Sequence, residues 1–149
     1  MLIFLDIDGV MVSGASWKTP ELLEDGFPMF TKKATQALQS LLSPETRVIL
    51  STSHRDRFTI AQWQEIFEKR GLRIEKLETL APVSMPSKRK DEILEWFNLH
   101  PVPDNFLIID DDRSLFGLPS YLKDHLVMTS SLVGLTPESL NEWGYEVPV

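Results

Sequence analysis

The sequence contains no cysteine among its 149 residues. Disulfide bonds and zinc sites with thiolate ligands are therefore excluded, and the composition agrees with a reducing compartment. No stretch approaches the roughly 20 apolar residues that a transmembrane helix needs, so we expect no membrane anchor. The first apolar segment has no basic residue before it and is interrupted at Asp6. It is unlike a secretory signal, which predicts a cytoplasmic location.

A net positive charge is also missing, since the formal net charge is -7. Proteins that coat nucleic acids without sequence preference depend on a positive field, so this class is excluded, although a local basic patch is not. The chain shows no internal repeat and no low-complexity tract. Its length suits one domain with a full hydrophobic core, and we predict a single domain over residues 1–149.

Apolar periodicity predicts alternating strands and helices. Thr31 is a candidate N-cap, Gly71 a candidate helix terminator, and Thr136 a candidate N-cap followed by Pro137 in the first helical turn. The predicted strands are 2–7, 47–53, a weak one near 74–80, 106–110 and 125–129; the predicted helices are 31–42, 58–71, 91–99 and 136–143. Continuous apolar strands that alternate with helices indicate an α/β fold: a three-layer, Rossmann-like parallel sheet with helices on both faces.

Polar side chains gather where the predicted strands end. Asp6 and Asp8 close the first strand, residues 51–55 follow the second, and residues 110–112 follow the fourth. Ligands of such sheets bind at the carboxyl ends of the strands, so we expect one site there. If the first strand stays extended, Asp6 and Asp8 point to the same face.

The chemistry of this edge follows from its charge. Five carboxylates at one edge repel one another unless a divalent cation is present, and an all-oxygen site suits Mg²⁺ rather than zinc. Magnesium commonly accompanies phosphate, and a carboxylate can attack phosphorus to form an aspartyl-phosphate. Asp6 and Asp8 can divide the attack and the proton transfer. The candidate metal residues are Asp6, Asp8, Asp110 and Asp111.

The order of these motifs resembles the haloacid dehalogenase (HAD) superfamily. The resemblance rests on DIDGV, on Ser51, on a basic residue before a helix, and on the acidic pair after FLII. It implies that Asp6 is the nucleophile and Asp8 the general acid and base. It also implies that Mg²⁺ is held by the Asp6 carboxylate, the Asp8 carbonyl and Asp110. Ser51, with Thr52 as the alternative, would bind a phosphoryl oxygen.

A closer resemblance covers most of the chain. The segments STSHR, RKDEILEWF, FLIIDDDRS and HLVMTSSLVGLT are similar to the HAD domains of Swiss Army Knife RNA repair proteins. In those domains the second motif more often reads Ser-Ser-Trp-Arg, so His54 stands where Trp is expected. Arg55 matches the pattern, and its guanidinium could clamp a phosphate or pair with an aspartate.

The basic residue of the third motif has three candidates, which are Lys88, Arg89 and Lys90. The superfamily pattern favours Lys88, whereas the closer resemblance aligns RKDEI with RGEEI and favours Arg89. We keep both as candidate phosphate-binding residues, together with Ser51, Thr52 and Arg55.

No insertion between Ser51 and Lys88 is long enough for a cap domain. Superfamily members without large caps tend to act on large substrates, including nucleic-acid ends. We therefore predict a capless Mg²⁺-dependent phosphatase whose partner is a phosphorylated substrate, such as a nucleic-acid end. Residues 10–30 form a predicted flap, in which Trp17 is a candidate stacking surface.

Each motif also has a structural alternative. Asp112 fits a helix N-cap, Ser51 and Thr52 fit a turn, residues 88–90 fit a solvated basic face, and His54 fits a polar rim. Two alternative functions remain. One is a HAD-like module that binds Mg²⁺ and phosphate without turnover. The other is a receiver-like phosphoacceptor domain, which the motif order disfavours because the third predicted strand ends without an aspartate.

Overall fold

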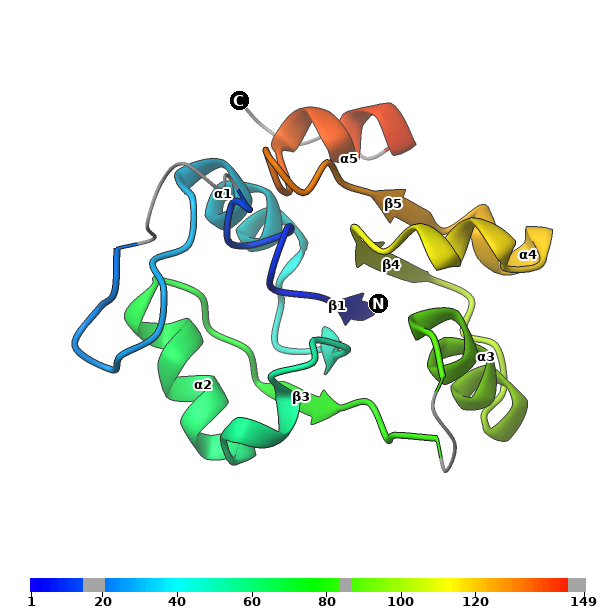
Figure 1. Ribbon diagram of the computed structural model, residues 1–149, viewed down its shortest axis with the longest axis horizontal. Helices are drawn as coiled ribbons and strands as arrows, with labels where there is room; N and C mark the ends of the chain where they lie inside the picture. The colour runs from blue at the N-terminus through cyan, green and yellow to red at the C-terminus, as the bar shows by residue number, and fades with distance from the viewer. Residues whose placement is uncertain (15–20, 84–86, 145–149) are drawn as a thin grey trace.

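The computed structural model describes residues 1–14, 21–83 and 87–144. Its five strands form one parallel sheet in the order β3-β2-β1-β4-β5 (Figure 1). The strands are β1 (Leu2–Leu5), β2 (Arg47–Leu50), β3 (Lys76–Thr79), β4 (Phe106–Asp110) and β5 (Leu126–Met128). The predicted α/β class is confirmed. The sheet order reverses direction between β1 and β4, and this switch point is where ligands of open parallel sheets bind.

The strand order also bears on the receiver alternative. Flavodoxin-like folds, to which receivers belong, have the order 2-1-3-4-5, in which the third strand lies beside the first. Here β1 lies between β2 and β4 instead. The receiver interpretation is therefore wrong at the level of topology.

Helices cover both faces of the sheet (Figure 1). One hydrophobic cluster joins alternate strand residues such as Ile3 and Leu5 to α1, α2 and α5. The other joins Leu2 and Phe4 to α3, α4 and the short 3-10 helix η2. The helices are α1 (Lys32–Leu41), α2 (Ile60–Lys69), α3 (Arg89–Leu99), α4 (Ser120–Lys123) and α5 (Pro137–Trp143), with 3-10 helices η1 (Arg55–Arg57) and η2 (Arg113–Gly117). None of the described helices is long and apolar enough to cross a membrane.

The predicted caps are confirmed. Thr31 accepts from the Ala34 N–H at 3.1 Å, and Thr136 accepts from the Ser139 N–H at the same distance. The helix α3 begins at Arg89, two residues before the predicted start. The reason is that the Asp91 carboxylate accepts the Lys88 N–H at 3.0 Å and so satisfies an N-terminal donor of the longer helix.

Part of the predicted flap is anchored in the core. Phe27 and Phe30 are buried, and Phe27 packs edge-on against Trp63. The Arg70 side chain, only 2% exposed, pairs with both oxygens of Asp25 at 2.7 and 3.0 Å. Its guanidinium also donates to the carbonyls of residues 27, 28 and 66. Trp17 lies outside the described residues.

We expect Asp25→Asn to lower the free energy of unfolding by about 3 kcal/mol at pH 7, because it leaves the buried Arg70 charge without its partner. The hydrogen bonds from Arg70 lower the pKa of Asp25 from 3.8 to about 2. A depressed carboxyl pKa contributes stability above the unfolded pKa and loses it as pH falls. The difference from the unaltered protein should therefore persist from pH 7 to about 4 and shrink between about 4 and 2.

Urea titrations across this pH range measure the effect, and the exposed neighbour supplies the control, Glu24→Gln. Equal losses in the two variants, or a loss that does not change with pH, would contradict this account of Asp25.

Candidate active site

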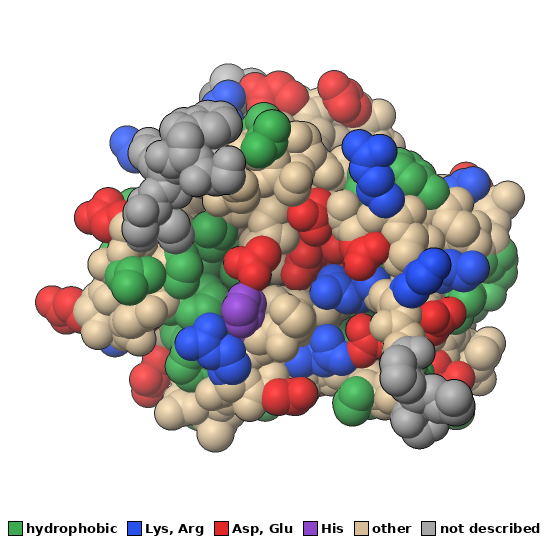
Figure 2. Space-filling model, viewed as in Figure 1, with side chains coloured by type: hydrophobic (Ala, Val, Ile, Leu, Met, Phe, Trp, Pro, Cys, Tyr) green, Lys and Arg blue, Asp and Glu red, His purple; other side chains and the backbone are tan. Residues whose placement is uncertain are grey.

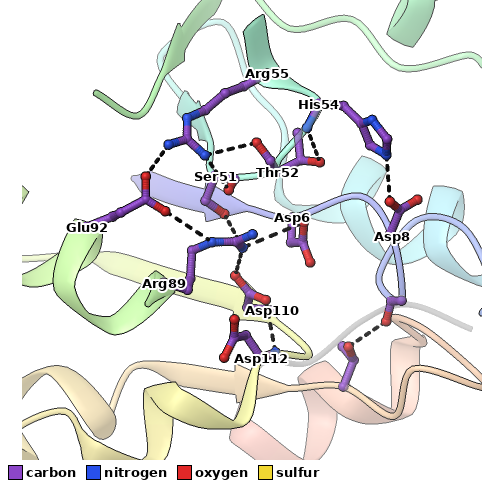
Figure 3. Close-up of polar contacts among 12 residues, drawn as sticks. Asp6, Asp8, Ser51, Thr52, His54, Arg55, Arg89, Glu92, Asp110 and Asp112 are labelled. Atoms are coloured by element: carbon purple, nitrogen blue, oxygen red, sulfur yellow. Dashed lines mark hydrogen bonds and ion pairs between the residues drawn. The ribbon is translucent and has the colours of Figure 1, made fainter. Parts of the chain in front are cut away.

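Three neighbouring strands bring their polar ends together, as the sequence predicts (Figure 3). Asp6 directly follows β1, Ser51 directly follows β2, and Asp110 is the last residue of β4. The register pairs Leu5 with both Leu50 and Ile109, so the three polar residues lie one position past the same level of the sheet. Figure 2 shows acidic side chains at the centre of this face, bordered by basic side chains and one histidine.

Three carboxylates form the centre of the site. One oxygen from each of Asp6, Asp110 and Asp111 lies within 4.8 Å of the others. Burial, reinforced by the neighbouring Asp110 carboxylate, raises the pKa of Asp6 from 3.8 to about 9. Burial also raises the pKa of Asp110, with Arg89 opposing the shift. The pair thus resists ionisation in the absence of a further positive charge.

Arg89 supplies a positive charge to this cluster from the first position of α3. Its Nη1 donates to Asp110 Oδ2 and lies 3.7 Å from Asp6 Oδ1 and 3.5 Å from Ser51 Oγ. Burial alone would lower the pKa of Arg89, but the Asp110 and Asp6 carboxylates outweigh it and raise that pKa. Of the three basic candidates, Arg89 is therefore the one whose side chain reaches the carboxylates.

The two neighbours of Arg89 point elsewhere. Lys88 is exposed at the N-cap of α3 and makes no ion pair with the described residues. Lys90 lies beside Gly117, where an added Cβ would come within 3.2 Å of its Nζ. A contact of either lysine with phosphate stays a prediction.

Glu92 is a site residue that sequence reasoning missed. Its carboxylate lies between two guanidinium groups: Oε2 accepts from Arg55 Nη2, and Oε1 is 3.7 Å from Arg89 Nε. The available signal was its position three residues after Arg89, on the same side of a helix. In the sequence, however, it is one of several charges in RKDEILE.

Arg55 is buried, and its two terminal nitrogens are engaged within the fold, whereas its buried Nε has no hydrogen-bond partner among the described residues. Nη1 donates to the carbonyls of Ser51 and Thr52, both at 3.1 Å, and Nη2 pairs with Glu92. The acidic partner is thus a glutamate, not the expected aspartate. Arg55 supports the end of β2 and orients Glu92, while a direct contact with phosphate stays a prediction.

Asp6 and Asp8 do not share a face, contrary to the expectation for a strand over residues 2–7. β1 ends at Leu5, and the Ile7 carbonyl then accepts the N–H groups of residues 10, 11 and 12 at 2.8–3.1 Å. This turn separates the two carboxylates: Asp6 is 5% exposed, whereas the Asp8 side chain is 61% exposed. Asp8 Oδ2 lies 2.7 Å from His54 Nε2, outside the central carboxylate cluster.

Ser51 and Thr52 are both buried but differ in their contacts. The Ser51 hydroxyl faces Arg89 and the carboxylates (Figure 3). The Thr52 hydroxyl accepts the His54 N–H at 3.2 Å and so supports the turn that leads into η1. The geometry favours Ser51 as the residue that faces a ligand.

The two carboxylates in the loop after β4, Asp111 and Asp112, make different contacts. Asp112 accepts the Ser114 N–H at 2.9 Å and caps η2, which agrees with the structural interpretation of that residue. Asp111 instead approaches Gly9, where an added Cβ would lie 2.0 Å from its Oδ2. Gly9 has a φ of 77°, so both its backbone and its neighbour require glycine. The Thr129 hydroxyl donates to the Gly9 carbonyl at 2.7 Å and holds this close approach.

The residues present fit a magnesium ion. The cluster offers only oxygen ligands, and two of its carboxyl groups have raised pKa values that a divalent cation would reverse. Asp110 Oδ1 accepts the Asp112 N–H at 3.0 Å and Oδ2 accepts from Arg89. Each carboxylate oxygen carries a second lone pair, so these bonds leave room for coordination.

The fold and the site define a HAD-type domain. Residues 2–140 match the family described as the HAD domain in Swiss Army Knife RNA repair proteins, and the chain belongs to this family. Neither curated proteins nor solved structures give a significant match. Membership supports a phosphatase-type hydrolase in general terms.

We expect the affinity for Mg²⁺ to rise with pH, by up to about tenfold per unit between pH 6 and 8. Burial and the neighbouring Asp110 carboxylate raise the pKa of Asp6 to about 9, and a cation that binds the carboxylate must displace a proton from it. Calorimetric titration in two buffers of different ionisation enthalpy counts the protons released. Asp6→Asn should weaken the dependence, whereas Asp112→Asn should keep it in full. An affinity that is equal at pH 6 and 8 would contradict the prediction.

We expect Glu92→Gln to lower the free energy of unfolding by about 3 kcal/mol, because it removes the negative charge between two largely buried guanidinium groups. Glu95→Gln, an exposed position on the same helix, should change it by less than about 0.5 kcal/mol. Urea unfolding followed by circular dichroism compares the two variants. Similar losses in both would show that Glu92 does not link Arg55 to Arg89.

Proposed function

We propose that the chain is a Mg²⁺-dependent phosphomonoesterase that acts through an aspartyl-phosphate on Asp6. The observation that supports this most is the convergence of Asp6, Asp110 and Asp111 with the Arg89 guanidinium and the Ser51 hydroxyl. A carboxylate nucleophile, a positive charge and a phosphoryl-oxygen donor are the groups that this reaction needs at one point.

The roles of the two aspartates are those that the HAD resemblance implies, and their different surroundings support them. The Asp6 carboxylate attacks phosphorus, and the bond from phosphorus to the leaving oxygen breaks. Asp8 gives a proton to that oxygen, then accepts one from the water that hydrolyses the aspartyl-phosphate. Burial of Asp6 and exposure of Asp8 suit this division, since only the proton carrier must exchange with solvent.

The remaining groups of the proposed site bind the phosphoryl oxygens or the metal ion. Arg89 and Ser51 bind the phosphoryl oxygens, and the ion pair of Glu92 with Arg55 keeps Arg89 in place. Asp6, Asp110 and Asp111, with the Asp8 carbonyl, would hold Mg²⁺, which neutralises the negative charge of the carboxylates and the phosphoryl group when bound.

The substrate class that we propose is a large phosphoester such as a phosphorylated nucleic-acid end. Two observations support it. Residues 1–14, 21–83 and 87–144 contain no cap domain that would enclose a small substrate, and the family description refers to RNA repair proteins. The net charge of -7 makes a recognition confined to the phosphorylated end more suitable than one along a long backbone.

We expect Mg²⁺-dependent release of phosphate from an aryl phosphate, and a fall of more than about 10⁴-fold in kcat for Asp6→Asn, because the nucleophile is removed. Phosphate release is measured colorimetrically with and without EDTA. The control is Asp104→Asn, an exposed aspartate just before β4 at the opposite edge of the sheet. Full activity of Asp6→Asn would refute the mechanism. No turnover on aryl or nucleic-acid phosphates, with Mg²⁺ binding intact, would instead indicate the binding module.

A further inference from the structure

His54 stands beside the proposed proton carrier and has no role in the reaction described so far. Its Nε2 lies 2.7 Å from Asp8 Oδ2. The Asp8 side chain is 61% exposed, and this is its single hydrogen bond within the described part of the chain. Without it, a largely exposed aspartate has no partner there to select one rotamer.

The partner of the second ring nitrogen of His54 assigns a tautomer to the ring. Arg57 Nη1 lies 3.2 Å from Nδ1 (the ring is drawn in Figure 3). A guanidinium can only donate, so Nδ1 accepts and Nε2 carries the ring proton. His54 therefore donates to the Asp8 carboxylate, and the hydrogen bonds run in one direction from Arg57 through the imidazole to Asp8.

His54 is held at its backbone and at its ring. The His54 backbone N–H donates to the buried Thr52 hydroxyl at 3.2 Å. The edge of the imidazole packs against Phe27 at 6.3 Å between centroids, with the ring planes at 90°. Phe27 in turn packs on Trp63 in the core. His54 is thus more firmly placed than the aspartate to which it donates.

We propose that His54 is a positioning residue that holds the Asp8 carboxylate in the orientation needed to protonate the leaving oxygen; this inference rests on the proposed phosphatase function. With Oδ2 engaged by His54, the other carboxylate oxygen is the one presented to the substrate. The value of this orientation depends on the leaving group, because a basic alkoxide or phenoxide needs a proton whereas a nitrophenolate leaves without one.

The dependence on the leaving group distinguishes a positioning role of His54 from a purely structural one. The Asp8 side chain is 61% exposed and that of His54 is 30% exposed, and contacts open to solvent in this way contribute little to the free energy of unfolding. A loss of fold or of phosphate binding would slow all substrates alike. A loss of proton delivery slows the substrate with the more basic leaving group.

The test compares phenyl phosphate with 4-nitrophenyl phosphate on the full chain with Mg²⁺. His54→Phe keeps the aromatic packing against Phe27 and removes the ring N–H. We expect kcat/KM for phenyl phosphate to fall roughly 10²-fold, and that for 4-nitrophenyl phosphate to change by less than about threefold. His54→Gln, which can present an N–H near the position of Nε2, should recover part of the loss. Ser53→Ala is the control.

A double-mutant cycle completes the test. In the Asp8→Asn background, His54→Phe should cause no further loss, because the residue acts through Asp8. Equal losses on both substrates, or additive losses in the double variant, would overturn the role of His54 while leaving the phosphatase function intact. An unaltered protein that hydrolyses neither these two substrates nor a phosphorylated nucleic-acid end would instead overturn the proposed function, and this inference with it.

Discussion

The mutual repulsion of the Asp6 and Asp110 carboxylates is the constraint on which the rest of the site depends. They lie at the ends of adjacent strands, and burial raises the pKa of both, with the Asp110 carboxylate adding to the shift of Asp6. Arg89 offsets part of this charge and is itself held by Glu92, which is held by Arg55. Arg55 then donates to the carbonyls at the end of β2. Balancing one acid pair thus links β1, β2, β4 and the start of α3 in a single network.

Two kinds of positive charge balance these carboxylates: the Arg89 guanidinium and the proposed divalent cation. Arg89 comes from a helix on one face of the sheet and approaches Asp110 from the side. Asp111 reaches the cluster from the loop after β4, over a glycine that leaves room for it. Arg89 carries a single delocalised charge and fits a planar group, so it complements the two buried acids only in part. Counting Asp111, three carboxylates against one guanidinium leave a surplus of two negative charges, which a divalent cation complements.

The sequence predicted the elements whose signals are local. β4 has its predicted bounds because five consecutive buried residues form it, and the caps at Thr31 and Thr136 hold as expected. The early end of β1 could not be predicted, because it depends on three N–H groups that fold back onto one carbonyl. Choosing Arg89 over Lys88 required knowing where α3 begins. Glu92 was missed because the sequence does not show whether a charged residue on a helix is buried. Its burial depends on the packing of Arg55 and Arg89 around it.

The turn at residues 6–8 shows how one short segment produces two different acids. Ile7 is fully buried, and its carbonyl accepts the N–H groups that end the strand. Its side chain therefore anchors the point at which the chain reverses, with Asp6 on the inner side and Asp8 on the outer side. A longer strand would have placed both carboxylates beside Asp110 and increased the repulsion there. The turn instead removes one carboxylate to the solvent side, where Asp8 Oδ2 contacts His54 Nε2.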